Sequence, residues 1–338
     1  MNTREALAAV QGGATLSSTE CEEVFGEVLG GRADPLVLAA LLASLAQRRE
    51  TRDELLGAVR ALRASMLPFE HSFPDAIDTC GTGGDGLGTF NISTAAALVA
   101  AAAGAQVVKH GNRAASSKSG SADLLEALGV CIELTPEQAR EVLEQVGITY
   151  LHAPLYHPAM RHAGPVRKAL GIRTIFNSLG PLANPGAVRR QLVGVSDGSR
   201  IEEVASILES LGHVRALVVH GGGGADELTL DGPNMVRCVG SLESFEAQGV
   251  NLGLDAAPVS ALAGGDAQHN AGILQRLLVG DGGPLRDALL YNVSAALVLA
   301  EKAASAEEGL QLAAEALDSG AAKDRLEQWV QLSQAVSA

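Results

Sequence analysis

The sequence is poor in aromatic residues and in positive charge. Phe, Trp and Tyr together make up 3% of its 338 residues, which leaves little material for the stacking platforms that bind single-stranded nucleic acid. Lys and Arg number 25 against 39 Asp and Glu, a net charge of −14. A surface that binds duplex nucleic acid or an anionic membrane is expected to be basic. An anionic ligand of this chain must therefore be bound in a local pocket.

Cysteine pairs and long apolar runs are also missing. No CxxC pair occurs, which excludes the usual zinc and redox signatures. The longest apolar run, residues 95–108, is too short to span a bilayer and is interrupted by Gly104 and Gln106. The N-terminus lacks the apolar core of a signal peptide. Scattered thiols are typical of a reducing compartment, so we expect a cytoplasmic protein. The cysteines are Cys21, Cys80, Cys131 and Cys238.

The chain has enough length and apolar content for about two domains, at roughly 150 residues each, with 47% hydrophobic residues. The first 67 residues predict about four short helices. Ser17–Glu20 and Thr51–Glu54 fit capping boxes, and Asp34 precedes Pro35 as an N-cap. Such helices bury little surface alone. We therefore expect residues 1–72 to form a helical domain on which an insertion, 157–188, packs.

From residue 73 onward, strands and helices alternate. Alternation of this kind indicates βαβ units and a parallel sheet. We predict the α/β fold class: a small all-helical domain plus a larger α/β domain with a mainly parallel central sheet, built from residues 73–156 and 189–338. The C-terminal third predicts helices, with a capping box at Ser305–Glu308. The β-prone runs lie at 76–80, 106–110, 130–134, 148–152, 191–195 and 215–220.

A glycine-rich segment follows the first predicted strand and precedes a helix. Five glycines fall within residues 81–88, and Asn91-Ile92-Ser93-Thr94 begins the helix. Glycine lets backbone N–H groups approach an oxyanion closely, and a helix N-terminus adds free donors. The segment matches neither the Walker A loop nor GxGxxG. It could be a flexible turn, but the combination favours an anion-binding loop.

A cationic loop follows the second predicted strand. Residues 109–121 hold three cations, one histidine and four serines in a chain of strongly negative net charge. Lys109 and Arg113 could neutralise a phosphate. A solvated loop with chance charges is the alternative, and it accounts poorly for this position at a strand's carboxyl end.

Two further features are weaker by themselves. Asp226 and Glu227 follow a predicted strand and the loop 221–224, and adjacent carboxylates on a loop suit Mg²⁺. Acidic pairs are common, but phosphate-binding candidates elsewhere favour a metal site. Arg167 could hold a carboxylate bidentately, or it could be an ordinary surface arginine of a helix.

Together these stretches resemble the anthranilate phosphoribosyltransferase family. The long run 109–129 is the most specific, and the motifs occur in the family's order across essentially the whole chain. They are GTGGD at 81–85, TFNIST at 89–94, KHGNRAASSKSGSADLLEALG at 109–129, HPAMRH at 157–162, RKALGIRTIFNSLGPLANP at 167–185 and DE at 226–227.

The resemblance implies a function in tryptophan biosynthesis. The family transfers the phosphoribosyl group of 5-phosphoribosyl 1-pyrophosphate to the amine of anthranilate, giving N-(5-phosphoribosyl)anthranilate and pyrophosphate, with Mg²⁺. It also implies two Mg²⁺ ions per active site, a site between the two domains, and a homodimer formed through the helical domain. No residue is assigned as a general acid or base.

By motif match, the resemblance also implies the site residues. Ser93 and Glu227 should reach one Mg²⁺, and Asp226 with Glu227 a second. Anthranilate should meet Gly81, Asn112 and Arg167, with His110 nearby. The donor should contact Gly81, Gly84, Asp85, Thr89, Asn91, Ile92, Ser93, Thr94, Lys109, His110, Gly111, Asn112, Arg113, Ala114, Ala115, Ser116, Ser117 and Ser121.

The chain departs from the family pattern at Gly221–Gly224, where the family more often has a less uniform loop ending in Leu. Uniform glycine leaves the backbone before the acidic pair more conformational freedom. Two rival functions remain. One is a pyrimidine nucleoside phosphorylase-like enzyme, whose phosphate loop reads differently from residues 109–117. The other is a non-catalytic relative that binds nucleic acid, against which the net charge argues.

Overall fold

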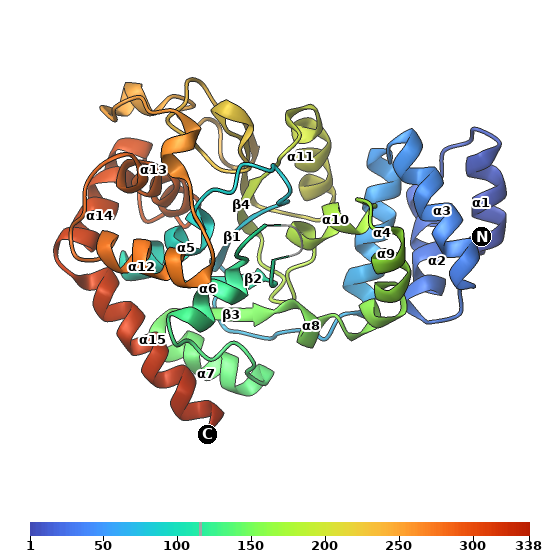
Figure 1. The fold of residues 1–338 in the computed structure, drawn as a ribbon, viewed down its shortest axis with the longest axis horizontal. Coiled ribbons are helices and arrows are strands. Elements are labelled where there is room, and N and C mark those ends of the chain that lie inside the picture. Colours follow the sequence, from blue (N-terminus) through green and yellow to red (C-terminus); the bar gives the residue numbers. More distant parts are fainter. Residues whose placement is uncertain (115–116) are drawn as a thin grey trace. The chain divides into compact units, whose positions relative to one another are not determined.

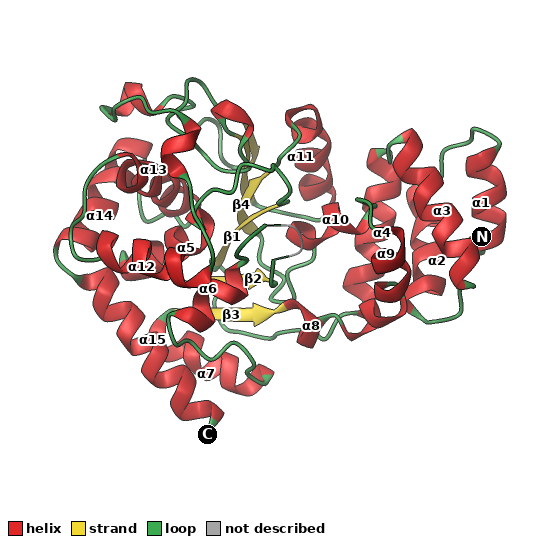
Figure 2. Cartoon of the chain, viewed as in Figure 1, coloured by secondary structure: helices red, strands yellow, loops and turns green. Residues whose placement is uncertain are grey.

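A computed structural model describes residues 1–114 and 117–338 of the chain. The described chain divides into two compact units. One unit contains residues 1–68 and 153–187, and the other contains residues 69–152 and 188–338. Figure 2 shows helices alone in the first unit and all the strands in the second.

The first unit confirms the predicted helical start of the chain. Its first helices are α1 (Thr3–Gln11), α2 (Ser18–Leu29), α3 (Pro35–Arg48) and α4 (Arg52–Ser65). The side chains of Ser17, Asp34 and Thr51 cap α2, α3 and α4 by accepting hydrogen bonds from backbone N–H groups, as predicted. Residues 153–187 add α8 (Ala153–Tyr156), α9 (Gly164–Leu170) and α10 (Phe176–Leu179).

The aliphatic side chains of these helices, with few aromatics, form the core of the first unit. Val24 and Leu41 are fully buried. Phe25 and Phe176 meet edge to face, with ring centroids 5.4 Å apart. Helices α2 and α4 approach closely because Gly57 lies against the backbone of Ser18, where a Cβ would clash.

The second unit is built on a six-stranded sheet with strand order β3-β2-β1-β4-β5-β6. The five strands from β3 to β5 run parallel, and β6 pairs antiparallel with β5. This confirms the α/β fold class with a mainly parallel sheet. The strands are β1 (Ile77–Gly81), β2 (Val107–Gly111), β3 (Ile148–His152), β4 (Arg190–Gly194), β5 (Arg215–His220) and β6 (Met235–Gly240).

Helices cover the sheet and complete the core. The alanine-rich α5 (Ile92–Ala102) and α13 (Pro284–Leu299) pack against the central strands, and α11 (Ile201–Ser210) packs against β5 and β6 (Figure 1). Helix α5 accounts for most of the long apolar run in the sequence, because it is buried almost all round. The remaining helices are α6 (Ser121–Ala127), α7 (Pro136–Val146), α12 (Ala267–Leu277), α14 (Ala306–Asp318) and α15 (Ala321–Ser337).

One expected strand was wrong and one strand was missed. Residues 130–134 form no strand; they alternate between buried and more exposed positions, but the backbone N–H of Cys131 donates to Ser333 Oγ of α15 at 3.0 Å. Their period-two pattern therefore packs against a helix instead of joining the sheet. Strand β6 was not predicted, because it is an edge strand with only one fully buried residue, Val239.

One capping prediction was correct only in part. Ser305 caps α14 by accepting a hydrogen bond from the N–H of Glu308. The carboxylate of Glu308 accepts instead from the N–H of Ala304 at 2.7 Å, so the reciprocal half of the box is not formed. Within the described residues, no helix is both long enough and apolar enough to cross a membrane.

Candidate functional site

The predicted loops converge where strands β1, β2 and β5 end. Strand β1 ends at Gly81 and leads through the glycine-rich loop into α5. Strand β5 ends at His220, and the loop 221–224 leads to Asp226 and Glu227. Parallel strands expose their carboxyl ends at one edge, which is where open α/β sheets bind ligands.

The glycine-rich loop holds Asp226 directly. The backbone N–H of Gly83 donates to Oδ2 of Asp226 at 2.6 Å. A Cβ on Gly81 would overlap that same carboxylate, and a Cβ on Gly194 would overlap the carbonyl oxygen of Asp226. Glycine is therefore needed at both strand ends for the acidic residue to sit against them. The sequence reasoning singled out Gly81 but missed Gly194.

Glu227 lies at the first turn of α5. The backbone N–H of Ser93 donates to Oε1 of Glu227 at 3.0 Å, and the Ser93 hydroxyl also hydrogen-bonds this carboxylate. The hydroxyl of Thr79 donates to the carbonyl oxygen of Ser93 at 2.8 Å, which ties this turn to β1. The predicted metal ligands are thus brought together from two parts of the chain: Ser93 from α5, and Asp226 and Glu227 from the segment after β5.

Burial makes this carboxylate pair electrostatically unfavourable in the absence of a cation. Asp226 and Glu227 are 9% and 8% exposed. Burial, with the charge of Asp226, raises the pKa of Glu227 to about 8. Burial, with the charge of Asp85, raises the pKa of Asp226 to about 6. The chain therefore keeps acidic groups in a place where their charge needs compensation.

The donor set fits Mg²⁺ held jointly with a phosphate ligand. The described residues contain no group of three or more His, Cys, Asp or Glu side chains arranged to hold a metal alone. Mg²⁺ prefers oxygen ligands, and it is commonly bound by one or two carboxylates together with waters and substrate phosphates. Two carboxylates and a hydroxyl beside a glycine loop meet that description.

The cationic loop, residues 109–121, is joined to the start of α5 by a network of side-chain hydrogen bonds that the sequence did not predict. The side-chain amide of Asn91 donates to the carbonyl oxygen of Ser119 at 3.1 Å. Its oxygen accepts from the Ser119 hydroxyl at 3.2 Å and from the amide of Asn270 at 2.8 Å. Asn270 lies on α12, 179 residues from Asn91 in the chain, and no local pattern links the two.

The two cations predicted to face phosphate have partners inside the protein. Lys109 is 2% exposed, and its ammonium donates to the carbonyl oxygen of Thr79 at 2.6 Å. Its charge also opposes the rise in the pKa of Glu227. Arg113 pairs with Asp123 and Glu126 of α6. A direct phosphate contact by either side chain stays a prediction.

The other predicted donor-binding residues take several positions. Ile92 and Thr94 are buried, so their side chains face the core and only their backbone is near the helix start. Gly111 lies against the Ser121 hydroxyl, which is 2.9 Å from the hydroxyl of Tyr150. Ala115 and Ser116 lie outside the described residues. Asp85 and Thr89 follow the glycines, with Asp85 Oδ1 accepting from the N–H of Leu87 at 3.1 Å.

His110 and Asn112 lie at the end of β2. The side chain of His110 is mostly buried, and its backbone N–H donates to Asp78 at 3.4 Å. The side-chain oxygen of Asn112 accepts from the N–H of Arg113 at 2.7 Å, within the cationic loop.

Arg167 belongs to the other compact unit. It lies on α9, and its guanidinium carbon is 5.3 Å from the ring centroid of Phe176. Burial lowers the pKa of Arg167. Among the described residues no carboxylate forms an ion pair with it. A half-buried cation stacked on an aromatic ring and lacking an anionic partner is suited to bind a carboxylate ligand.

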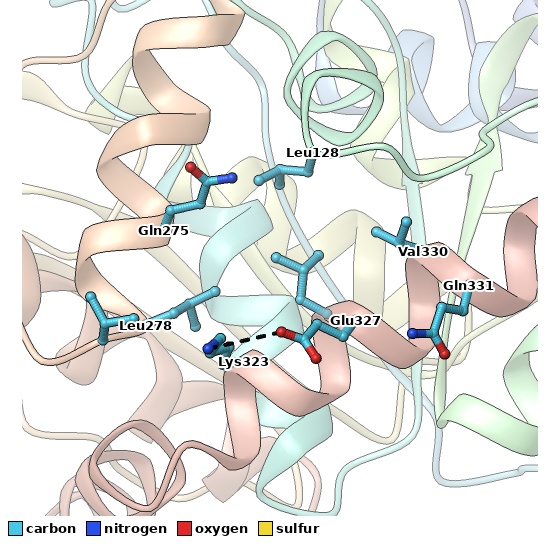
Figure 3. Close-up of a pocket in the computed structure, with 9 residues that line it drawn as sticks. Leu128, Gln275, Leu278, Lys323, Glu327, Val330 and Gln331 are labelled. Carbon is cyan, nitrogen blue, oxygen red and sulfur yellow. Dashed lines mark ion pairs between the residues drawn. The ribbon is translucent and has the colours of Figure 1, made fainter.

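A cavity of about 390 Å³ lies away from these loops, beside α12 and α15 (Figure 3). Lys323 and Glu327 form an ion pair at its edge, 3.9 Å apart. None of the predicted site residues lines it. Its lining residues are Leu128, Gln275, Leu278, Val279, Lys323, Leu326, Glu327, Val330 and Gln331.

Two family models match the chain. Residues 4–66 match the helical bundle domain of a glycosyl transferase family, and residues 73–323 match the α/β domain of that family. An anthranilate phosphoribosyltransferase from Rhodopseudomonas palustris is 47% identical over 331 residues, covering 97% of this chain and 98% of the relative. The enzyme of the same name from Roseiflexus castenholzii is 48% identical over 337 residues, covering 98% and 99%.

Solved structures give the same result. Anthranilate phosphoribosyltransferase from Thermus thermophilus superposes with a TM-score of 0.91 at 44% identity, covering 97% of this chain and 99% of that one. The enzyme from Saccharomyces cerevisiae, solved in complex with PRPP and Mg, superposes with a TM-score of 0.89 at 28% identity, covering 98% of each chain. A further structure of the yeast enzyme contains 4-fluoroanthranilate.

Proposed function

The chain belongs to the anthranilate phosphoribosyltransferase family, and we propose that Asp226, Glu227 and the two loops beside them form the site of its reaction. The enzyme transfers the phosphoribosyl group of 5-phosphoribosyl 1-pyrophosphate to the amine of anthranilate. A bond forms between the amine nitrogen and the anomeric carbon, and the bond from that carbon to pyrophosphate breaks. The products are N-(5-phosphoribosyl)anthranilate, pyrophosphate and a proton.

The buried acidic pair beside the glycine-rich loop carries this proposal. Ser93 and Glu227 would hold one Mg²⁺, and Asp226 with Glu227 a second. Bound Mg²⁺ neutralises charge that grows on the leaving pyrophosphate. The raised pKa values of Asp226 and Glu227 support the assignment, because a cation removes the electrostatic cost that burial imposes on this pair.

The loops then position the donor. The amides of the glycine-rich loop and the start of α5 would contact its phosphates, as helix N-termini commonly do. The ammonium of Lys109 donates to the carbonyl oxygen of Thr79, and its charge offsets part of the negative charge of Glu227. The proposed donor contacts are Gly81, Gly84, Asp85, Thr89, Asn91 to Thr94, residues 109–117 and Ser121.

The acceptor needs orientation more than activation. An aromatic amine is uncharged near neutral pH and can attack without prior loss of a proton, so no general base is required. Arg167 would hold the carboxylate of anthranilate, while Gly81 and Asn112 contact the molecule and His110 lies near it. Positioning and electrostatic stabilisation would supply most of the rate enhancement.

We further propose that the enzyme is a cytoplasmic homodimer formed through the helical unit. Leu36, in the first turn of α3, is 81% exposed, which is high for a large apolar side chain and is consistent with a surface that another protomer covers. Light scattering should give the mass of two chains, and Leu36→Lys should shift it toward one. A wild-type protein that stays a single chain at micromolar concentration would contradict this proposal.

The fluorescence of anthranilate provides the test of activity. Purified protein is mixed with anthranilate, 5-phosphoribosyl 1-pyrophosphate and MgCl₂, with chelator and no-donor controls. We expect loss of anthranilate signal only when both the donor and Mg²⁺ are present. Folded protein that binds the donor without turnover would contradict the acceptor assignment. Nucleosides with phosphate, and then single-stranded DNA, would be offered next.

A further inference from the structure

The acidic pair lies between a stretch of glycines and a segment that is hydrogen-bonded to a core helix. On its N-terminal side, Gly221–Gly224 has left-handed φ angles of +77° at Gly223 and +92° at Gly224. Glycine suits these left-handed angles, and a Cβ on Gly221 would overlap the carbonyl oxygen of Glu227, so this stretch lies close against the pair. Gly83 and Ser93 bind the two carboxylates themselves, and the backbone that carries them is held on its other side.

That other side is held by Asn292 of α13. Asn292 is fully buried. Its side-chain oxygen accepts from the backbone N–H of Leu228 at 3.1 Å, and its amide donates to the carbonyl oxygen of Leu228 at 2.8 Å. The amide also donates to the carbonyl oxygen of Ala288 at 2.9 Å, one turn earlier in α13. One side chain thus satisfies both backbone groups of the residue that follows Glu227.

A second asparagine extends this arrangement. Asn234, also buried, accepts from the N–H of Thr229 at 2.9 Å and from the N–H of Gly222 at 3.2 Å. The hydroxyl of Thr229 donates to the carbonyl oxygen of Gly222 at 2.9 Å. The glycine loop is therefore fastened to the segment after the acidic pair, and Asn292 fastens that segment to a core helix.

We propose that Asn292 is a positioning residue for the acidic pair. By hydrogen-bonding both the N–H and the carbonyl oxygen of Leu228, it sets where Glu227 and Asp226 present their carboxylates to a divalent cation. The inference rests on the proposed function, in which this pair binds Mg²⁺. Asn292 itself does not touch the cation. Replacing a residue that orients metal ligands without binding the metal typically changes metal affinity by about 10–100-fold.

The test uses Asn292→Leu, which keeps the number and branching of the side-chain heavy atoms and removes all three hydrogen bonds. Asn292→Ser, a milder change, replaces it if the first variant does not fold. Ser294→Ala is the matched control, because Ser294 is equally buried on the same helix and its hydroxyl donates only to the carbonyl oxygen of Tyr291, at 2.7 Å. Glu227→Gln reports on the metal assignment itself.

Two measurements are made on each full-length protein. The first is binding of Mn²⁺, used as a paramagnetic probe in place of Mg²⁺, in the presence of inorganic pyrophosphate. The second is hydrogen–deuterium exchange of the peptide that covers residues 222–230 in metal-free protein. We expect the Asn292 variants to bind Mn²⁺ at least about tenfold more weakly and to exchange faster in that peptide. Ser294→Ala should match the wild type in both.

The outcomes separate this inference from the function on which it rests. If Glu227→Gln binds Mn²⁺ as the wild type does, the metal assignment is wrong. If Glu227→Gln loses the cation while the Asn292 variants keep wild-type affinity, the positioning role is wrong, whether or not exchange is faster. If Ser294→Ala weakens Mn²⁺ binding equally, the effect reflects general loss of stability and the proposal fails.

Discussion

The backbone N–H of Gly83 and the carboxylate of Asp226 form a hydrogen bond of 2.6 Å across 143 residues of sequence. This bond joins the loop predicted to bind phosphate to the pair predicted to bind metal. A charge-assisted hydrogen bond of this length favours the ionised form of the carboxylate. Burial nevertheless raises the pKa of Asp226 to about 6, so the bond only partly offsets the loss of solvation.

The space beside Asp226 predicts the effect of a methyl group at Gly81. A Cβ there would overlap the Asp226 carboxylate, so Gly81→Ala should displace it and lower kcat/KM by about a hundredfold or more, since small misplacements at a reacting centre are costly. Initial rates at several Mg²⁺ concentrations measure this. Gly272→Ala, where the nearest atom is 3.8 Å from a new Cβ, should keep wild-type activity. Equal activity of the two variants would refute the prediction.

Replacing Glu227 by Gln should remove activity and stabilise the metal-free protein. The pKa of this group is raised to about 8 in the folded protein. Between its unfolded pKa and pH 8, the unfolded chain has lost a proton that the folded protein keeps, so the wild type is destabilised increasingly, and fully above pH 8. At pH 7, Gln should therefore raise the free energy of unfolding by roughly 1–3 kcal/mol. Urea titrations with chelator measure this at pH 5 and pH 7.

The gain for Glu227→Gln should shrink at pH 5, because the carboxyl of the unfolded wild type is then partly protonated, as it is in the folded protein. A variant less stable than the wild type at pH 7 would contradict the electrostatic account. Saturating Mg²⁺ should stabilise the wild type and leave the variant nearly unchanged, because only the wild type retains the second carboxylate.

Arg167→Ala should affect the two substrates unequally. Loss of the guanidinium removes the proposed partner of the anthranilate carboxylate, so the KM for anthranilate should rise at least about tenfold, in line with a charged hydrogen bond of 1.5–3 kcal/mol. The KM for the sugar donor should change little. The exposed neighbour Lys168, replaced by Ala, serves as the control. Equal increases for both substrates would indicate a structural role for Arg167.

His157 should make the protein less stable in mild acid. Burial lowers its pKa to about 4, while the unfolded side chain titrates near 6.5. Between these values the unfolded state binds the extra proton, so stability contributed by neutral His157 is present above pH 6.5 and is lost as the pH falls toward 4. From pH 7 to pH 5, the wild type should lose about 2 kcal/mol more than His157→Gln.

Circular dichroism during urea unfolding at the two pH values gives this difference. His162→Gln, at an exposed position in the same unit, is the control and should follow the wild type. A His157→Gln variant whose stability falls with pH as steeply as that of the wild type would show that other groups govern the acid response.

Local signals explain what could be predicted of the fold. The caps at Ser17, Asp34 and Thr51 act within three residues, and buried parallel strands contain short β-branched or aliphatic runs, as β2 and β5 do. Strand β6 was missed because an edge strand with one fully buried residue carries little apolar pattern. Segment 130–134 was mispredicted because an apolar pattern does not say whether its partner is a strand or a helix, and contacts such as the one between Cys131 and Ser333 make that choice.

The candidate site also contains residues that local patterns identify and residues that only tertiary contacts bring in. Motifs and strand ends identified Gly81, Asp226 and Glu227, because glycine loops and acidic pairs are recognisable by composition alone. Asn270, by contrast, contributes an ordinary polar side chain from 179 residues away from Asn91. Nothing in its immediate neighbours marks it as a partner of the site.

By itself, the sequence determined the helical and α/β parts, the order of the elements and the residue types able to bind phosphate, metal and a carboxylate. These depend on backbone preferences and residue chemistry within a few positions. Only the tertiary structure decided that Lys109 faces inward to Thr79, that Glu227 is buried at α5, and that Asn292 holds Leu228. The physical reason is that burial, and with it charge state and orientation, depends on what packs from elsewhere in the chain.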